Sequence, residues 1–135
     1  EQAFRMLAEK AQYMPDPQLK ALLDLELARC NVALSRPEQA HEKLTEVLLN
    51  IKPGPDGHQA ACLLAEICLQ LDKPQQALSV CRQITDADLS EKTRIRLNHI
   101  LAATHSELEN YEDAITALLP PDTEAENVDT EINTN

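Results

Sequence analysis

Pro37-Glu38-Gln39-Ala40 returns as Pro74-Gln75-Gln76-Ala77, and related stretches occur as Glu1-Gln2-Ala3 and Tyr111-Glu112-Asp113-Ala114. The alanines stand at positions 3, 40, 77 and 114, so each follows its predecessor by 37 residues. A fixed period of about 20 to 50 residues, shared by segments with helical apolar spacing, indicates stacked helical repeats. The sequence therefore predicts a series of like units rather than one globular core.

Each unit is predicted to contain two helices. Met14-Pro15-Asp16-Pro17 ends a helix over residues 1–13, because proline does not continue a helix, and its Asp-Pro pair is typical of an N-cap and a first helical position. The next helix is expected over residues 17–35, and a second one of about fourteen residues begins at Pro37. After a break at residues 53–57, where Asp56 is interpreted as a turn or cap residue, the pair returns.

Apolar and small residues recur with the same period. The expected core stripes are Leu23, Leu27, Cys30 and Leu34, then Ala60, Leu64, Ile67 and Leu71, then Leu97, Leu101, Thr104 and Leu108. Small residues mark the middle of each first helix (Ala28, Ala65, Ala102) and the start of each second helix (Ala40, Ala77, Ala114). Helices approach most closely where side chains are small, so we expect antiparallel hairpins that close at these alanines.

Composition narrows the fold and function classes. The chain is 43% hydrophobic but only 2% aromatic, and it holds two glycines, which favours an all-α fold. A net charge of -11 argues against nucleic-acid binding through a basic face. No apolar run approaches the ~20 residues of a membrane helix, so no membrane insertion is expected. Phosphate-binding, GxSxG and HExxH motifs are missing from the sequence, and we predict neither catalysis nor a cofactor.

The first residue and the cysteines bear on context. The chain begins with Glu1, and its first repeat lacks the front half, so we interpret it as a fragment of a longer protein, in which any targeting segment would lie outside these residues. The four cysteines form no CxxC pair, which predicts reduced thiols and a cytoplasmic location. Cys68 and Cys81 are expected to be neighbours. A disulfide between them, which would place the protein in the periplasm or outside the cell, stays open as the alternative to two buried thiols.

Several of these columns in register resemble the tetratricopeptide repeat family over about residues 1–119. The carriers are the Leu-Ala pairs at residues 27–28, 64–65 and 101–102, together with the four stretches that end in alanine. The resemblance implies a right-handed α-solenoid of antiparallel helix hairpins. Residues 1–20 would include the second helix of a truncated repeat, followed by repeats over 21–57, 58–94 and 95–119. Residues 120–135 would form an acidic tail or the start of a further helix.

The chain departs from the usual family pattern. Its 37-residue period exceeds the usual one of about 34 residues. The aromatic positions of the family are filled instead by Asn31, Cys68 and His105 in the first helices and by Leu44, Cys81 and Leu118 in the second helices. We therefore predict a divergent member.

In this family the first helices line a concave groove that holds a peptide or helix of another protein. By register, the implied partner-binding residues are Leu22, Leu25, Arg29, Val32, Gln59, Cys62, Glu66, Leu69, Arg96, His99, Ala103 and Ser106. The resemblance thus implies a non-catalytic scaffold or adaptor. The alternative is a regulatory segment of a larger enzyme or of a secretion or assembly machine, packed on a sister domain.

The groove residues narrow the expected partner. The Lys, Asn and Arg residues with which some family members clamp a terminal carboxylate are not found in the matching columns, so an apolar or amphipathic segment fits better. Alternatively, Leu22, Leu25 and Val32 pack against a preceding helix or a second copy of the chain, which would be self-association. A less favoured interpretation is a zinc site made by His58, Cys62, Glu66 and His99.

Overall fold

The computed structural model describes residues 2–3, 5–6, 8, 16–85 and 87–119. Within residues 16–119, less residue 86, all regular structure is helical: α2 (Pro17–Ala33), α3 (Pro37–Asn50), α4 (Pro55–Gln70), α5 (Pro74–Ile84), α6 (Glu91–Glu107) and α7 (Tyr111–Leu118). The predicted all-α class is confirmed. Of the helix predicted over residues 1–13, positions 2, 3, 5, 6 and 8 are described, and all are helical. The predictions for residues 120–135 lie outside the described part of the chain.

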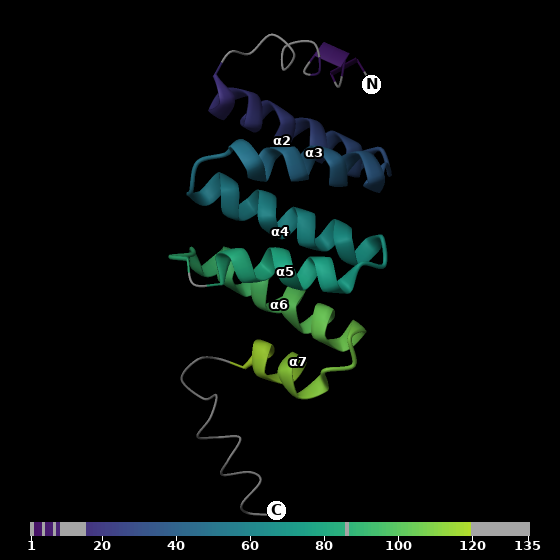
Figure 1. Ribbon diagram of the computed structural model, residues 1–135, viewed down its shortest axis with the longest axis vertical. Helices are drawn as coiled ribbons and strands as arrows, with labels where there is room; N and C mark the ends of the chain where they lie inside the picture. The colour runs from purple at the N-terminus through teal and green to yellow at the C-terminus, as the bar shows by residue number, and fades with distance from the viewer. Residues whose placement is uncertain (1, 4, 7, 9–15, 86, 120–135) are drawn as a thin grey trace, which may run out of the picture.

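The helices follow one another along the longest axis of the molecule (Figure 1). Each helix packs against the next one in the chain, and α4 also packs against α6. The pairs α2–α3, α4–α5 and α6–α7 are the three predicted hairpins. The described residues thus form a helical, repeat-like architecture.

The turn inside each hairpin has the same conformation in all three hairpins. The residue that follows the C-cap of the first helix in each hairpin has a left-handed backbone conformation: Ser35 (φ 58°), Asp72 (φ 60°) and Glu109 (φ 61°). The next backbone N–H donates to a carbonyl five residues earlier, from Arg36 to Asn31 (2.8 Å), from Lys73 to Cys68 (2.7 Å) and from Asn110 to His105 (2.7 Å). This is the Schellman arrangement, which satisfies the carbonyls at a helix end. The sequence period therefore corresponds to a repeated backbone geometry.

Helix starts agree with the expected capping, with two differences. Asp16 caps α2 by accepting a hydrogen bond from the Gln18 backbone N–H at 2.9 Å, and Pro17 follows at the first helical position. Asp56, expected as a turn or cap residue, lies instead in the first turn of α4, because Pro55 already begins that helix and Gly54 is its N-cap. Gly54 has a φ of 152°, which favours glycine. α2 begins at Pro17, as expected, whereas α4 and α6 begin at residues 55 and 91, three and four residues before the repeat boundaries assigned at 58 and 95.

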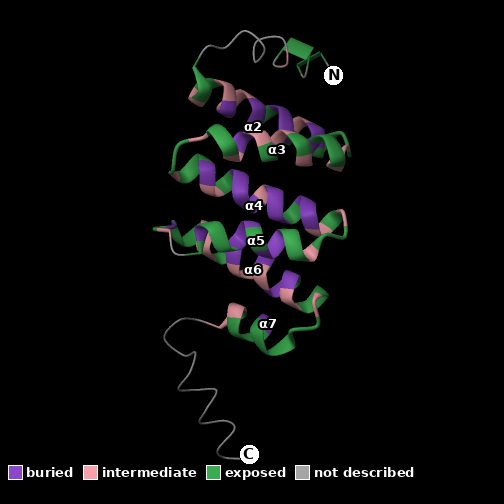
Figure 2. Ribbon diagram, in the orientation of Figure 1, coloured by how far each residue is buried: buried purple, intermediate pink, exposed green. Residues whose placement is uncertain are grey.

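The core runs through the interior of the stack (Figure 2). All six marker alanines are buried, with exposed fractions of 0% for Ala28, Ala40, Ala65 and Ala77, 7% for Ala102 and 6% for Ala114. Leu44 and Val47, with 0% exposed, belong to the same apolar cluster. Leu34, expected in the core stripe, is 38% exposed because it stands after the last turn of α2. Burial of the alanines agrees with hairpins that close where side chains are small.

The left-handed turn residues supply the first stability prediction. We expect Glu109→Gly to raise the free energy of unfolding by about 0.5–1 kcal/mol. A left-handed conformation costs a residue with a Cβ about 1–2 kcal/mol, and glycine loses part of that gain to chain entropy. Urea denaturation would measure the change. Glu109→Ala is the control, because alanine keeps the Cβ and should give no gain; equal gains from both variants would contradict the explanation.

Candidate functional site

The twelve residues assigned to the groove lie on α2, α4 and α6. Ten are exposed or half-buried, and they define what we call the groove face: Leu22, Arg29, Val32, Gln59, Glu66, Leu69, Arg96, His99, Ala103 and Ser106. The other two differ from the expectation, because Leu25 is 2% exposed and Cys62 is 1% exposed. Both side chains belong to the core cluster and contribute little to the exposed surface of the face, although Leu25 is among the residues that line one of its hollows. Leu25 is likewise too buried to belong to an exposed self-association patch.

Polar bridges connect successive first helices across the groove face. Arg29 on α2 donates through Nη2 to Oε1 of Gln59 on α4 at 2.9 Å, while its Nη1 pairs with Glu26. Glu66 on α4 forms an ion pair with Arg96 on α6. In both bridges the partners are 30 residues apart. This separation is shorter than the 37-residue period by about two helical turns. The bridges therefore repeat in register and order the face.

Two hollows open on the groove face beside these bridges. The N-terminal hollow, of about 290 Å³, has Leu19, Leu22, Leu23 and Leu25 as its apolar lining and Glu26, Arg29 and Asp56 as its polar lining. The middle hollow, of about 330 Å³, is lined by Glu66, Leu69, Arg96, His99, Ile100 and Ala103. Apolar side chains are combined with Arg29 of the first bridge in the N-terminal hollow and with both members of the Glu66–Arg96 bridge in the middle hollow. That combination suits an apolar side chain flanked by polar groups.

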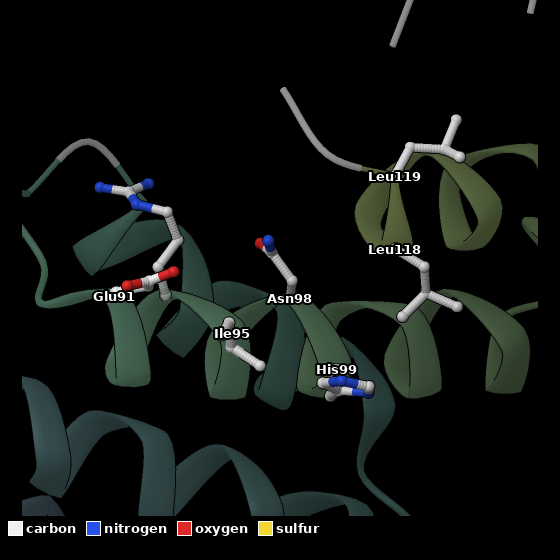
Figure 3. A pocket seen from close by; sticks show the side chains of 7 residues that line it. Glu91, Ile95, Asn98, His99, Leu118 and Leu119 are labelled. Atoms are coloured by element: carbon white, nitrogen blue, oxygen red, sulfur yellow. The ribbon is translucent and has the colours of Figure 1, made fainter. Parts of the chain in front are cut away.

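The sequence did not predict a third cavity, the C-terminal hollow of about 400 Å³ between α6 and α7. Figure 3 shows Ile95, Asn98 and His99 along α6, with Leu118 and Leu119 at the end of α7. The feature of the sequence that could have indicated this cavity is the Pro120-Pro121 pair. It stands just after α7, which has 8 residues, whereas α3 has 14 and α5 has 11.

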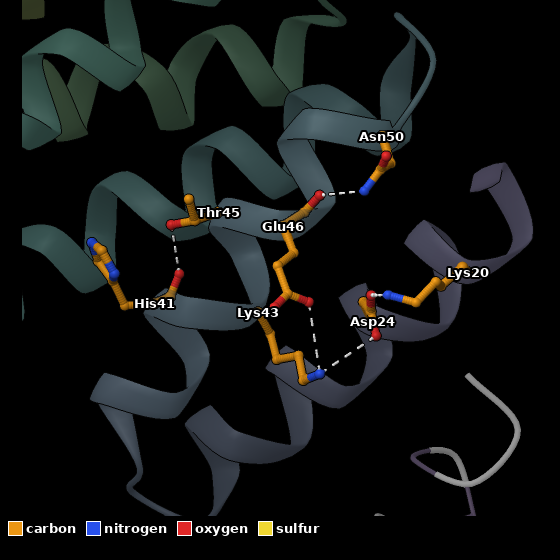
Figure 4. A network of polar contacts seen from close by, with 7 residues as sticks. All are labelled: Lys20, Asp24, His41, Lys43, Thr45, Glu46 and Asn50. Atoms are coloured by element: carbon orange, nitrogen blue, oxygen red, sulfur yellow. Dashed lines mark hydrogen bonds and ion pairs between the residues drawn. The ribbon is translucent and has the colours of Figure 1, made fainter. Parts of the chain in front are cut away.

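A buried carboxylate was also missed (Figure 4). Asp24 is 1% exposed, and its carboxylate lies 3.3 Å from Nζ of Lys20 and 3.9 Å from Nζ of Lys43 on α3. Its counterparts one and two periods later are Ala61 and Asn98, so the sequence column showed no repeated charge. Because both lysines are partly exposed, we interpret this cluster as a link between the two helices of the first hairpin.

The cysteines are all free thiols in the structure. Cys62, Cys68 and Cys81 are buried, and burial raises the pKa of each thiol. For Cys81 the pKa rises to about 12, mainly through burial and further through the nearby Cys62 and Cys68. Cys68 and Cys81 are thus neighbours, as expected, and they carry no disulfide. The Sγ of Cys68 donates to Oε1 of Gln76 at 3.2 Å.

The zinc interpretation finds no geometric support. Among the described residues, no group of three His, Cys, Asp or Glu side chains is arranged to hold a metal ion. Cys62 is buried in the core, and Glu66 is already paired with Arg96.

Burial of the thiols yields a second prediction. Under native conditions near pH 8, we expect iodoacetamide to modify Cys30 alone, because Cys30 is half-buried whereas the other three thiols are buried and keep their protons. Mass spectrometry should show one added group on the folded chain. In denaturant without reductant, four groups should be added. Fewer than four under those conditions would reveal a disulfide.

In the part of the chain that the structure describes, no helix combines the length and apolar character needed to cross a bilayer. No family model matches the chain, and no curated protein or solved structure gives a significant match to it.

Proposed function

We propose that the chain is a non-catalytic protein-interaction module, a divergent tetratricopeptide-like right-handed α-solenoid that binds another protein along its groove face. The observation that carries the proposal is the pair of hollows on α2, α4 and α6, which lie in register on one face. Stacked hairpins commonly present such a continuous surface to a partner. The repeated hairpin turn supports the solenoid interpretation, because like turns join like hairpins.

The lining of the hollows favours an amphipathic helix or an extended peptide as the bound segment. Leucines line the N-terminal hollow, and Leu69, Ile100 and Ala103 line the middle one, so apolar anchors of the partner would be buried there. The Arg29–Gln59 and Glu66–Arg96 bridges already use polar groups of the face. Apolar burial therefore supplies the affinity, and the polar rim supplies orientation.

The test fills one hollow without disturbing the core. A peptide selected from a displayed library against the intact chain is titrated against wild type and two tryptophan variants. Ala103→Trp, at an exposed residue that lines the middle hollow, should weaken binding about tenfold or more, because the indole takes the space of the partner's anchor. Ser79→Trp, at an exposed residue of α5, is the matched control and should leave the affinity within about twofold.

Equal affinities for wild type and Ala103→Trp would place the binding surface elsewhere. Failure to select any peptide, together with a chain that copurifies only with a sister domain, would favour the alternative of a regulatory segment in a larger assembly.

A further inference from the structure

The C-terminal hollow occupies a place that is filled in the other hairpins. Asn98, His99 and Leu118 line it, and one period earlier the same columns hold Ala61, Cys62 and Cys81, each 1% exposed. Two periods earlier they hold Asp24, Leu25 and Leu44, which are also buried. The last hairpin alone, among the three described, leaves this part of its interior open.

The shortness of α7 explains the opening. In the first two hairpins the second helix continues to Val47 and Ile84, which are 0% and 8% exposed and belong to the core. The equivalent position in the last hairpin is Pro121, beyond the end of α7 at Leu118. Proline lacks the N–H that a continuing helix needs, so the turn that would cover the hollow is not formed by α7. Apolar side chains at Ile95 (52% exposed) and Leu118 (54% exposed) stay uncovered.

We infer that the acidic segment, residues 120–135, docks back on its own chain and fills the C-terminal hollow with Val128 and Ile132. The two apolar residues are four apart, so they share one side of a helical turn. Asn127 lies one period after Ser90, which is the N-cap of α6. Ser90 accepts a hydrogen bond from the backbone N–H of Thr93, and Thr130 lies one period after Thr93. Asn is also a favoured N-cap, so this stretch has the local signals for a helix start.

Connectivity favours this occupant over a second chain. The segment contains five acidic residues and no Lys or Arg: Asp122, Glu124, Glu126, Asp129 and Glu131. The lining of the hollow contains one cation, Arg94, and one carboxylate, Glu91, so charge alone does not select the occupant. Leu119, which lines the hollow, directly precedes the segment. A short tether gives an effective concentration of about millimolar, which sustains even a weak contact.

The inference does not depend on the proposed function, because it concerns the end of the stack. The two sites are adjacent, however, since His99 lines both the C-terminal hollow and the middle hollow. The docked segment would therefore form one wall beside the groove face.

The test is methyl NMR on the full chain. Nuclear Overhauser contacts are expected from Ile132 or Val128 methyl groups to those of Ile95 and Leu118. Ile115, 59% exposed on α7 and outside the lining, serves as the internal control and should show none. The double variant Val128→Asp/Ile132→Asp should shift the Ile95 and Leu118 resonances, whereas Thr123→Asp, which adds charge without removing an apolar anchor, should leave them in place.

A mixture of labelled and unlabelled chains separates the possible occupants. If the segment docks within one chain, the contacts persist when the uniformly labelled sample is diluted. They are then missing from the isotope-filtered spectrum of the mixture, which reports only contacts between a labelled and an unlabelled chain. Contacts seen only between labelled and unlabelled chains would overturn the inference in favour of a second copy. Absence of contacts, with unchanged Ile95 and Leu118 resonances in the double variant, would overturn it outright.

Discussion

Ala77→Leu is expected to lower the free energy of unfolding by roughly 1–3 kcal/mol. Ala77 is 0% exposed at the start of α5 and belongs to the core cluster, so three added carbon atoms have no space to enter. They must either push α5 away from its neighbours or adopt a strained rotamer. Because α5 packs on both α4 and α6, the displacement would affect two hairpins at once.

Urea and thermal denaturation would measure this effect. Ala33→Leu is the matched control, since Ala33 is exposed in the last turn of α2 and leucine is a good helix former there. We expect the control to remain within about 0.5 kcal/mol of wild type. A melting curve for Ala77→Leu that coincides with wild type would remove the argument that buried alanines set the helix spacing.

Alkaline pH is expected to destabilise the protein through Cys81. The pKa of this thiol rises from 9.0 to about 12 on folding, so the folded chain keeps a proton that the unfolded chain gives up. The stabilisation is complete below about pH 9 and is lost as the pH rises toward about 12. The loss attributable to Cys81 is on the order of 1 kcal/mol between pH 8 and pH 10, and it grows further by pH 11.

The measurement compares urea unfolding of wild type and Cys81→Ala across this pH range. The variant begins less stable, because it leaves a small cavity, but its stability should fall less steeply with pH. Cys62 and Cys68 also have raised pKa values, so the variant keeps part of the dependence. Parallel curves for the two proteins would show that the Cys81 thiol ionises as easily in the folded chain as in the unfolded one.

Much of the local structure could be predicted from the sequence. Pro37 and Pro74 begin second helices as expected, because proline at the first helical position sacrifices no hydrogen bond. The burial of Ala40 and Ala77 also followed from their period. These features depend on a few neighbouring residues and on spacing along one helix, which a single sequence records.

The exposure of particular groove residues could not be predicted in the same way. Leu25, Cys62 and His99 share one column of the repeat, yet the first two are buried and His99 is exposed. The column is identical by spacing, but its surroundings differ, because α7 ends before it can cover the last hairpin. Burial depends on the length of a helix that lies elsewhere in the chain, and period alone carries no such information.

The sequence by itself determined the helical class, the 37-residue repeat and the small residues at which the hairpins close, since each depends on local backbone preference and side-chain size. Only the tertiary structure decided which members of a column reach solvent, that Arg29 meets Gln59 and Glu66 meets Arg96, and where the hollows open. These features arise from the distances between helices that are far apart in the chain, and such distances are set by the packing of all the helices together.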